Sequence, residues 1–303
     1  MPELPDVVVY IEALKPRVVG ARLEGFTLVS PFVLRSVDPP IDSIRGRIVG
    51  DVCRVGKRIV LAFDPSPGSP DADGLFLVLH LMIAGRLRWR ETPDSKPRVA
   101  PKLILATFEF PGGTLLFTEA GSKKRASMQL VRGREAVAAL DPGGIEPLDA
   151  TLEEFSDALR RENHTLKRAL TDPHLLSGIG NAYSDEILHA ARMPPLKLTR
   201  SLSEAEIETL FHATRDTLTM WIERLRQQSS GGFPEKVTAF REDMAVHGRF
   251  RQPCPVCRSP VQRIVYADNE CNYCARCQTG GRLLADRSLS RLLRDDWPRS
   301  IDG

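Results

Sequence analysis

The spacing of the cysteines is the feature that most restricts how this chain can fold. Five of the six cysteines lie between residues 254 and 277, whereas Cys53 stands alone. Disulfide frameworks are typical of small secreted chains, while a tight cluster of cysteines in a chain of 303 residues indicates a metal site. The C-terminal part of the chain is therefore expected to fold around a metal.

Two overlapping pairs compete for the second half of that site. Cys271 and Cys274 form one C-x2-C pair, and Cys274 and Cys277 form another. Joining Cys254 and Cys257 to Cys274 and Cys277 leaves sixteen residues between the pairs, within the range of roughly 15–20 that is typical of zinc sites. Using Cys271 instead leaves thirteen, which is short. We therefore expect one structural zinc ion, Zn²⁺, bound by Cys254, Cys257, Cys274 and Cys277.

Short apolar runs dominate residues 21 to 131. They are rich in Val, Ile, Leu and Phe and are separated by loops that contain Pro, Gly and Asp, a pattern typical of an antiparallel β-sandwich. A helix at about residues 6 to 19 precedes them. The expected strands lie in ARLEGFTLVS, GRIVGDVCRVG, RIVLAF, LFLVLH, KLILATFEF and TLLFT.

The hydrophobic period changes to that of helices over residues 150 to 228. Thr151 and Glu154, and again Ser203 and Glu206, have the spacing of a capping box at a helix start. The following stretch, QQSSGGFPEK, is expected to be a linker to the cysteine-rich segment. Since there is neither βαβ alternation nor a GxGxxG motif, a dinucleotide-binding fold is not expected.

Composition restricts the class of protein without selecting one. Hydrophobic residues make up 42% and charged residues 27% of the chain, as in ordinary globular proteins. The formal net charge of +3 permits nucleic-acid binding without arguing for it. No apolar run approaches the roughly 18 residues of a membrane span, and no basic region precedes an apolar one at the N-terminus. We therefore expect a cytoplasmic protein with no membrane partner.

The cysteine-rich segment is also rich in arginine. Between residues 249 and 282 the acidic residues are Asp268 and Glu270, and two tyrosines, Tyr266 and Tyr273, lie among the arginines. A rigid, positively charged hairpin with aromatic side chains suits a nucleic-acid groove, although zinc ribbons also bind proteins. The arginines are Arg249, Arg251, Arg258, Arg263, Arg276 and Arg282.

The first six residues, MPELPD, crowd two prolines and two acids before an apolar run. Pro5 near a helix start and Asp6 at the positive end of the helix dipole are readily explained. Pro2 and Glu3 are not explained by helix formation.

Four stretches, in order, resemble the formamidopyrimidine-DNA glycosylase / endonuclease VIII family. They are MPELPD, GKR at 56–58, SGIGNAYSDEIL at 177–188 and the terminal C-x2-C…C-x2-CQ. The resemblance extends from residue 2 to about residue 280. It implies an α+β multidomain protein with an N-terminal antiparallel β-sandwich and flanking helix (1–132), a helix–two-turn–helix domain (133–230), a zinc finger (240–282) and a C-terminal tail (283–303).

The resemblance also implies a function for the N-terminus. After removal of Met1, Pro2 would present an amine that attacks C1′ of a damaged nucleotide, because an α-amino group has a pKa of about 7.7–8.0 and is partly neutral at cell pH. Glu3 would shuttle the proton, and Lys57 would contact phosphate and assist elimination. Asn181 is implied to hold a phosphate at a helix start, and His80 matches the family's HLGMSGRL segment near DNA.

Three departures from the family pattern concern the residues that open and hold the lesion. Asp6 stands where the family usually has Glu. In the stretch FTEAGSKKRASM, which replaces a segment of the type DPRRFG, we expect Lys123, Lys124 and Arg125 to supply the charge that contacts DNA. After the expected strand TLLFT, this stretch has no aromatic residue to wedge into the gap left by a flipped nucleotide.

The third departure lies in the finger, and a fourth position is ambiguous. Asn269 stands where the family has an arginine that contacts phosphate. The two parallel, charge-assisted hydrogen bonds of that arginine are therefore lost unless Arg276 or Arg263 supplies them. The methionine of HLGMSG aligns with Ile83, unless Met82 takes its place. We therefore expect a changed lesion preference with weak excision of 8-oxoguanine.

The sequence thus predicts a bifunctional DNA glycosylase and AP lyase of base-excision repair, of a bacterial, nucleoid-associated type. Its expected partner is double-stranded DNA that contains damaged bases or abasic sites, bound by a monomer. A non-catalytic reader of damaged or abasic DNA is the alternative, although binding alone does not require a terminal amine. A zinc-ribbon protein adaptor would leave MPELPD unexplained.

Overall fold

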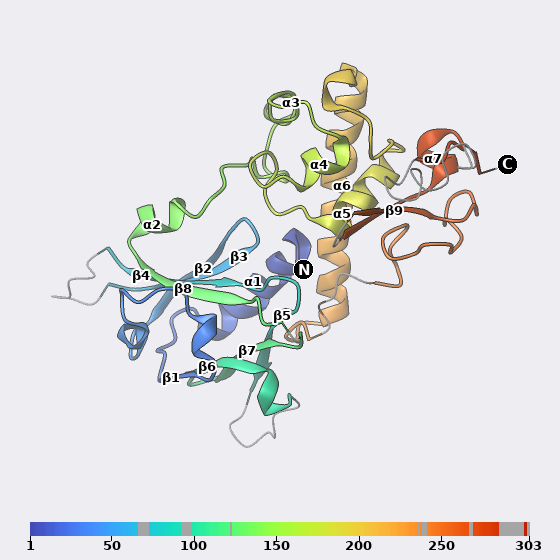
Figure 1. Ribbon diagram of the computed structural model, residues 1–303. Helices are drawn as coiled ribbons and strands as arrows, with labels where there is room; N and C mark the ends of the chain where they lie inside the picture. The colour runs from blue at the N-terminus through green and yellow to red at the C-terminus, as the bar shows by residue number, and fades with distance from the viewer. Residues whose placement is uncertain are drawn as a thin grey trace. The chain divides into compact units, whose positions relative to one another are not determined.

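A computed structural model describes residues 1–65, 73–91, 99–121, 123–235, 237, 241–266, 269–284 and 300–301. Its internal packing divides the chain into two units, whose elements are drawn in Figure 1. Unit 1 comprises Met1–Pro142 and Trp221–Thr238, and unit 2 comprises Gly143–Met220 and Ala239–Gly303. Asp268 and most of the predicted tail at 283–303 lie outside the described residues.

Unit 1 contains two four-stranded antiparallel sheets, as the short apolar runs predicted. Their strand orders are β2-β3-β4-β8 and β1-β6-β7-β5. The strands are β1 (Gly25–Leu28), β2 (Val49–Val55), β3 (Arg58–Phe63), β4 (Leu75–His80), β5 (Gly85–Arg90), β6 (Ile104–Phe110), β7 (Gly113–Glu119) and β8 (Ser127–Arg132).

The two sheets share one hydrophobic core. Leu61 of β3 and Leu77 of β4 are fully buried in it, together with Phe108 of β6 and Phe117 of β7. Strands β5 and β8 were not expected as separate strands from the sequence. Their burial alternates residue by residue with half-exposed Arg, Ser and Gln, so neither strand forms a continuous apolar run.

Helix α1 (Leu4–Val18) packs along β2 and β3 and fixes the start of the chain. Glu3 is the extended N-cap residue, and its backbone N–H donates to Asp6 Oδ2 at 2.9 Å, which forms one half of a capping box. Pro5 lies in the first turn, where no N–H is needed for the helical ladder. The N-terminal residues are therefore held by the helix rather than frayed.

The stretch after the long helix α6 (Glu204–Ser229) is more than a linker. Phe233 packs against Tyr10 of α1 with ring centroids 5.7 Å apart, and the guanidinium of Arg17 lies 5.8 Å from the Phe233 ring centroid. Val237 belongs to the core of unit 1. The interpretation of residues 227–236 as a plain linker missed this packing because Ser and Gly surround the one aromatic residue.

Unit 2 begins with the helices that the change of period predicted. Both predicted capping boxes are present: Thr151 Oγ1 accepts from the Glu154 N–H at 3.2 Å, and Ser203 Oγ accepts from the Glu206 N–H at 3.3 Å. Short α2 (Arg134–Ala138) belongs to unit 1. The remaining helices of unit 2 are α3 (Leu152–Arg160), α4 (Leu166–Thr171), α5 (Asn181–Ala190) and the first part of α6.

The C-terminal part of unit 2 is a hairpin followed by a short helix. Strands β9 (Gln262–Tyr266) and β10 (Asn269–Tyr273) pair antiparallel and lead into α7 (Ala275–Thr279). Helix α5 packs against both β10 and α7. Within the described parts of the chain, no helix combines the length and the hydropathy that crossing a bilayer would require.

Candidate active site and metal centre

The start of the chain is buried although it is rich in charge. Glu3 and Asp6 are each 2% exposed, and Pro2 is buried beside them. Burial lowers the pKa of the Met1 amine below its usual value of 8.0; Glu3 opposes this shift and Arg86 adds to it. An amine at this end of the chain is therefore more easily neutral than one in water.

Lys57 occupies the tight turn that the sequence predicted between two strands. Val55 of β2 pairs with Arg58 of β3, so two residues close the hairpin, and Gly56 adopts a φ of +56° that favours glycine. Burial lowers the pKa of the Lys57 ammonium, and Glu3 is the charge that opposes this shift. The structure thus brings Lys57 and Glu3 within electrostatic reach of each other.

His80 closes the same group of side chains. It is the last residue of β4, paired with Arg58 of β3 and with Ser127 of β8. Burial, together with the positive charges of Arg58 and Lys57, lowers the pKa of His80 to about 4. His80 is therefore neutral at physiological pH.

Arg86 is a functional candidate that the sequence analysis missed. Its guanidinium donates to the carbonyl oxygens of Ile83 at 3.0 Å and Gly85 at 2.7 Å, and also to that of Val237. These bonds fix the β4–β5 turn, in which Met82 has a φ of +51° and Ile83 is 58% exposed. Of the two candidates for the family's methionine, Ile83 is the exposed one. An arginine among other arginines carries no sequence signal for this role.

The basic stretch after β7 is organised by a buried acid that was also missed. Glu119 is 1% exposed, and its carboxylate accepts the backbone N–H groups of Arg125 at 3.0 Å and Ala126 at 3.2 Å. The Lys124 ammonium donates to the Glu119 carbonyl oxygen. Lys123, Lys124 and Arg125 are all exposed, as a role in contacting DNA requires.

Two asparagines predicted to contact DNA lie in unit 2. Asn181 is the first residue of α5, and its Nδ2 donates to the Glu270 carbonyl oxygen on β10 at 2.9 Å. Asn269 opens β10 opposite Tyr266 and is exposed. The structure therefore links Asn181 to the hairpin that carries Asn269, which the sequence did not suggest.

The aromatic and arginine side chains of the hairpin differ in their availability. Tyr266 is 42% exposed, but Tyr273 is 1% exposed and its hydroxyl accepts the Leu284 N–H at 2.8 Å. The expectation that Tyr273 faces nucleic acid is wrong because this ring fills the small core of the finger. Arg263 lies 4.3 Å from the Phe250 ring centroid and 3.4 Å from Glu270, so its guanidinium already has partners.

A buried network of charges joins α4, α5 and the loop before the β9–β10 hairpin. Lys167 Nζ lies 2.6 Å from Asp185 Oδ1, and His247 Nδ1 lies 2.8 Å from Asp185 Oδ2. The Asn272 N–H donates to the same carboxylate at 3.1 Å. Sequence reasoning missed this network because a Lys and an Asp eighteen residues apart carry no periodic signal.

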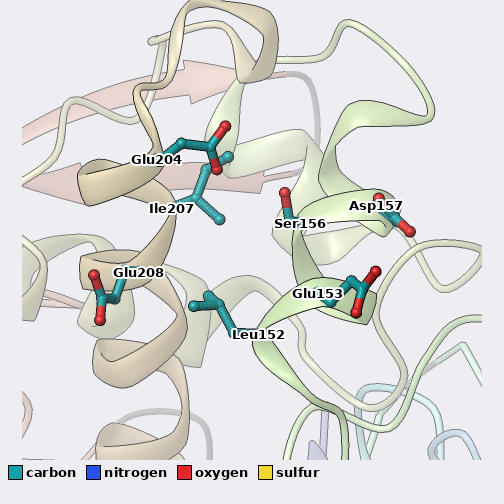
Figure 2. Close-up of a pocket in the computed structure, with 7 residues that line it drawn as sticks. All are labelled: Leu152, Glu153, Ser156, Asp157, Glu204, Ile207 and Glu208. Carbon is teal, nitrogen blue, oxygen red and sulfur yellow. The ribbon is translucent and has the colours of Figure 1, made fainter.

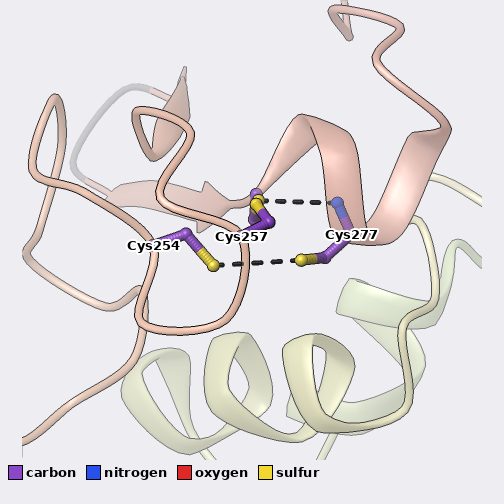
Figure 3. Close-up of side chains that lie close together, drawn as sticks. Cys254, Cys257 and Cys277 are labelled. Atoms are coloured by element: carbon purple, nitrogen blue, oxygen red, sulfur yellow. Dashed lines mark hydrogen bonds between the residues drawn. The ribbon is translucent and has the colours of Figure 1, made fainter.

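The four cysteines chosen from their spacing form one cluster. Their sulfur atoms all lie within 4.8 Å of one another, with Cys254–Cys277 at 3.9 Å and Cys257–Cys274 at 3.3 Å. Figure 3 shows Cys254 and Cys277 facing each other. A tetrahedral zinc site with Zn–S bonds of about 2.3 Å has sulfur–sulfur edges of about 3.8 Å, so the four thiols fit one zinc ion.

Cys271, the alternative ligand, is excluded from this cluster. Its side chain is 1% exposed in the apolar core of the finger with Ile264 and Tyr273. Burial raises the pKa of the Cys271 thiol well above its usual value, and the nearby Asp185 acts in the same direction. Cys271 is therefore an unreactive core residue rather than a metal ligand.

A pocket of about 440 Å³ between α3 and α6 is acidic and does not suit nucleic acid. Figure 2 shows the side chains that line it. Glu153 and Glu204 lie in the first turns of their helices, where negative charge offsets the helix dipole. The lining residues are Leu152, Glu153, Ser156, Asp157, Glu204, Ile207 and Glu208.

Comparison with known proteins relates these sites to one family. Residues 1–122 match the family model of the formamidopyrimidine-DNA glycosylase N-terminal domain, and residues 144–231 match that of the formamidopyrimidine-DNA glycosylase H2TH domain. The chain is 31% identical to the formamidopyrimidine-DNA glycosylase of Thermus thermophilus, over 93% of this chain and 100% of that protein. It is 30% identical to that of Symbiobacterium thermophilum, over 92% and 89% of the two chains.

Solved structures give the same result. The crystal structure of MutM (Fpg) from Thermus thermophilus has a TM-score of 0.72 at 31% identity and covers 91% of this chain and 98% of that one. The Lactococcus lactis Fpg, in complex with DNA that contains an abasic site, has a TM-score of 0.76 at 23% identity, with 91% and 99% covered, and so shares the fold. The predicted arrangement of β-sandwich, helix–two-turn–helix domain and four-cysteine element is confirmed.

Proposed function

The chain belongs to the formamidopyrimidine-DNA glycosylase family of base-excision repair enzymes, and we propose that it removes damaged bases and nicks abasic sites through Pro2, Glu3 and Lys57. One observation supports this most strongly. At the buried start of α1, the Glu3 carboxylate lies within electrostatic reach of Lys57, and burial lowers the pKa of the Met1 amine. A neutral amine beside a carboxylate is what nucleophilic attack on a sugar requires.

The proposed chemistry begins once Met1 is removed and Pro2 carries the terminal amine. The nitrogen lone pair forms a bond to C1′ as the C1′–base bond breaks, and the departing base keeps the electron pair of the broken bond and takes up a proton from water. Glu3 accepts the proton from the amine and passes it to the ring oxygen, which opens the sugar to an iminium. Loss of a C2′ proton then expels the 3′ phosphate, a second elimination expels the 5′ phosphate, and water releases Pro2.

We further propose that damaged double-stranded DNA is bound by a monomer that holds one zinc ion. The Lys57 and Lys124 side chains offer N–H donors to phosphate, as do the neutral amides of Asn181 and Asn269. The residues proposed to contact DNA are His80, Lys123, Lys124, Arg125, Asn181 and Asn269. Zinc would supply a rigid support for the finger, with Cys254, Cys257, Cys274 and Cys277 as its ligands.

The lesion preference follows from the altered residues. An amide at Asn269 cannot reproduce the two parallel bonds of an arginine to phosphate, and Arg263 is already engaged by Phe250 and Glu270. We therefore propose efficient cleavage at abasic sites and weak excision of 8-oxoguanine. Robust excision of 8-oxoguanine in a lesion panel would overturn this part of the proposal.

Borohydride trapping tests the central claim. The processed protein is incubated with a duplex that contains one abasic site, and the iminium is reduced to a stable covalent complex. Adding two residues before Pro2 should abolish trapping while binding to the duplex is retained, because the amine becomes an amide. A Pro2→Gly variant cannot serve here, since glycine keeps an amine. Retained binding without any trapping by the processed protein would instead identify a reader of damaged DNA.

A further inference from the structure

A histidine from the helical domain contacts the sulfur cluster. His189 lies in the last turn of α5 and is 6% exposed. Its Nε2 is 3.3 Å from the sulfur of Cys254, a distance within the range of hydrogen bonds to sulfur. Cys254 itself is fully buried. The contact joins residues 65 positions apart, so the finger's sulfur is supported by a different element of unit 2.

A partly buried four-thiolate zinc site needs hydrogen-bond donors. Four thiolates around Zn²⁺ leave a net charge of about −2, and burying that charge is costly unless N–H groups point at the sulfurs. The Cys277 N–H approaches Cys274 Sγ at 3.5 Å. At Cys254 the corresponding nitrogen is that of the His189 ring.

We propose that His189 is a positioning residue for the zinc ion: its Nε2–H donates to the Cys254 thiolate and makes retention of the metal depend on helix α5. The four close cysteine sulfurs complete the set of zinc ligands, so His189 is not itself a ligand. Its ring therefore acts on the metal indirectly, through its hydrogen bond to Cys254. The ring must then be the tautomer protonated at Nε2. A phenylalanine would fill nearly the same volume but could not donate.

Zinc release to a chromogenic chelator tests this role in the full chain. His189→Phe should release zinc about tenfold faster than the unmodified protein, in line with the effect of removing partners of metal ligands. His189→Gln, which keeps an N–H donor, should release it at an intermediate rate. His212→Phe is the matched control, because His212 lies on α6 with its side chain 61% exposed, and its release rate should be unchanged. Equal rates for His189→Phe and the unmodified protein would overturn the proposal.

Spectroscopy of the intact protein keeps the proposal testable if His189→Phe fails to fold. Nitrogen NMR of the unmodified, zinc-loaded protein should show a slowly exchanging imidazole proton at Nε2 of His189. In the cobalt-substituted protein, His189→Gln should shift the sulfur-to-metal charge-transfer band, since the hydrogen bond to one thiolate changes. A ring protonated only at Nδ1, or an unshifted band, would contradict the hydrogen bond. None of these measurements depends on DNA cleavage.

Discussion

Two lysines, one in each unit, show how differently this protein treats a positive charge that is at least partly removed from solvent. In unit 2, Lys167 is 8% exposed and its Nζ contacts Asp185 Oδ1 at 2.6 Å, Asn181 O at 2.7 Å and Ser184 Oγ at 2.8 Å. In unit 1, burial outweighs the favourable effect of Glu3 and lowers the pKa of Lys57. The charge of Lys167 is compensated by close partners, whereas the lowered pKa of Lys57 makes its ammonium easier to deprotonate.

The difference separates structure from chemistry. A charge with a short ion pair and two further hydrogen bonds holds elements together, and removing its partner leaves an uncompensated charge in the interior. A lysine whose pKa is lowered gives up its proton more readily than a lysine in water, as acid–base catalysis requires. The substitutions below test whether unit 2 relies on its cluster for stability and unit 1 relies on its cluster for activity.

The largest effect on stability is expected from Asp185→Asn. Asp185 is fully buried and serves Lys167, His247 and the Asn272 N–H, so the amide leaves a buried ammonium without its counter-charge. We expect a loss of about 3–5 kcal/mol in the free energy of unfolding. Denaturant unfolding of the zinc-loaded protein measures it.

The matched control for Asp185→Asn is a surface ion pair. Glu12 and Arg226 lie 2.6 Å apart, with side chains 40% and 49% exposed. Glu12→Gln should cost about 0–1 kcal/mol, because solvent screens such a pair. Similar losses for the two variants would show that the Asp185 cluster is not a special source of stability.

The next largest effect is expected on activity, from Lys57→Met. If Lys57 assists elimination, strand nicking should fall by about 100-fold, a typical contribution of acid–base catalysis. Stability at pH 7 should not fall, because the variant no longer buries a charge against its preference. Lys15→Met is the control, since Lys15 pairs with Asp51 on the surface. A stability loss with unchanged nicking would reverse the assignment.

How far the sequence could predict this protein depends on the kind of signal each region carries. The β-sandwich, the capped helices and the cysteine pairs follow from periodicity and spacing, and all three are confirmed. Glu119, Arg86 and Asp185 were missed, although each organises its surroundings. Their roles depend on burial and on backbone partners distant in sequence, which a residue's identity does not reveal.

The departure at Asp6 illustrates the same limit. From sequence, its shorter side chain suggested a change in lesion preference, whereas the structure shows its carboxylate accepting the Glu3 N–H at the start of α1. The role visible in the structure is therefore to hold the main chain of a proposed catalytic residue. A capping box is recognised in the sequence only when its first residue is Ser or Thr, and here that residue is Glu3.

A smaller effect on stability is expected from Asp6→Ala. The Glu3 N–H loses its acceptor, which should cost about 1 kcal/mol in the free energy of unfolding. Trapping on abasic DNA should also slow, because Glu3 is less firmly placed. Asp6→Glu should restore both, since a longer carboxylate at the same helical position can still reach the N–H. If Asp6→Ala traps DNA at the unmodified rate, the capping bond is irrelevant to the chemistry.

The last effect, about as small as that of Asp6→Ala, is a pH dependence from His80. Its pKa is about 4 in the folded chain and 6.5 in its usual state, so between these values the unfolded chain binds more protons. Stability should therefore rise with pH from about 4 to about 6.5 and be fully present above, with a total change of about 1 kcal/mol because solvent partly screens this half-buried ring. His80→Gln should flatten this part of the curve, whereas His212→Gln should leave it unchanged. Parallel curves of unfolding free energy against pH for His80→Gln and the unmodified protein would mean that burial and the nearby cations do not lower the pKa of His80. The contrast between the two units would then rest on the lysines alone.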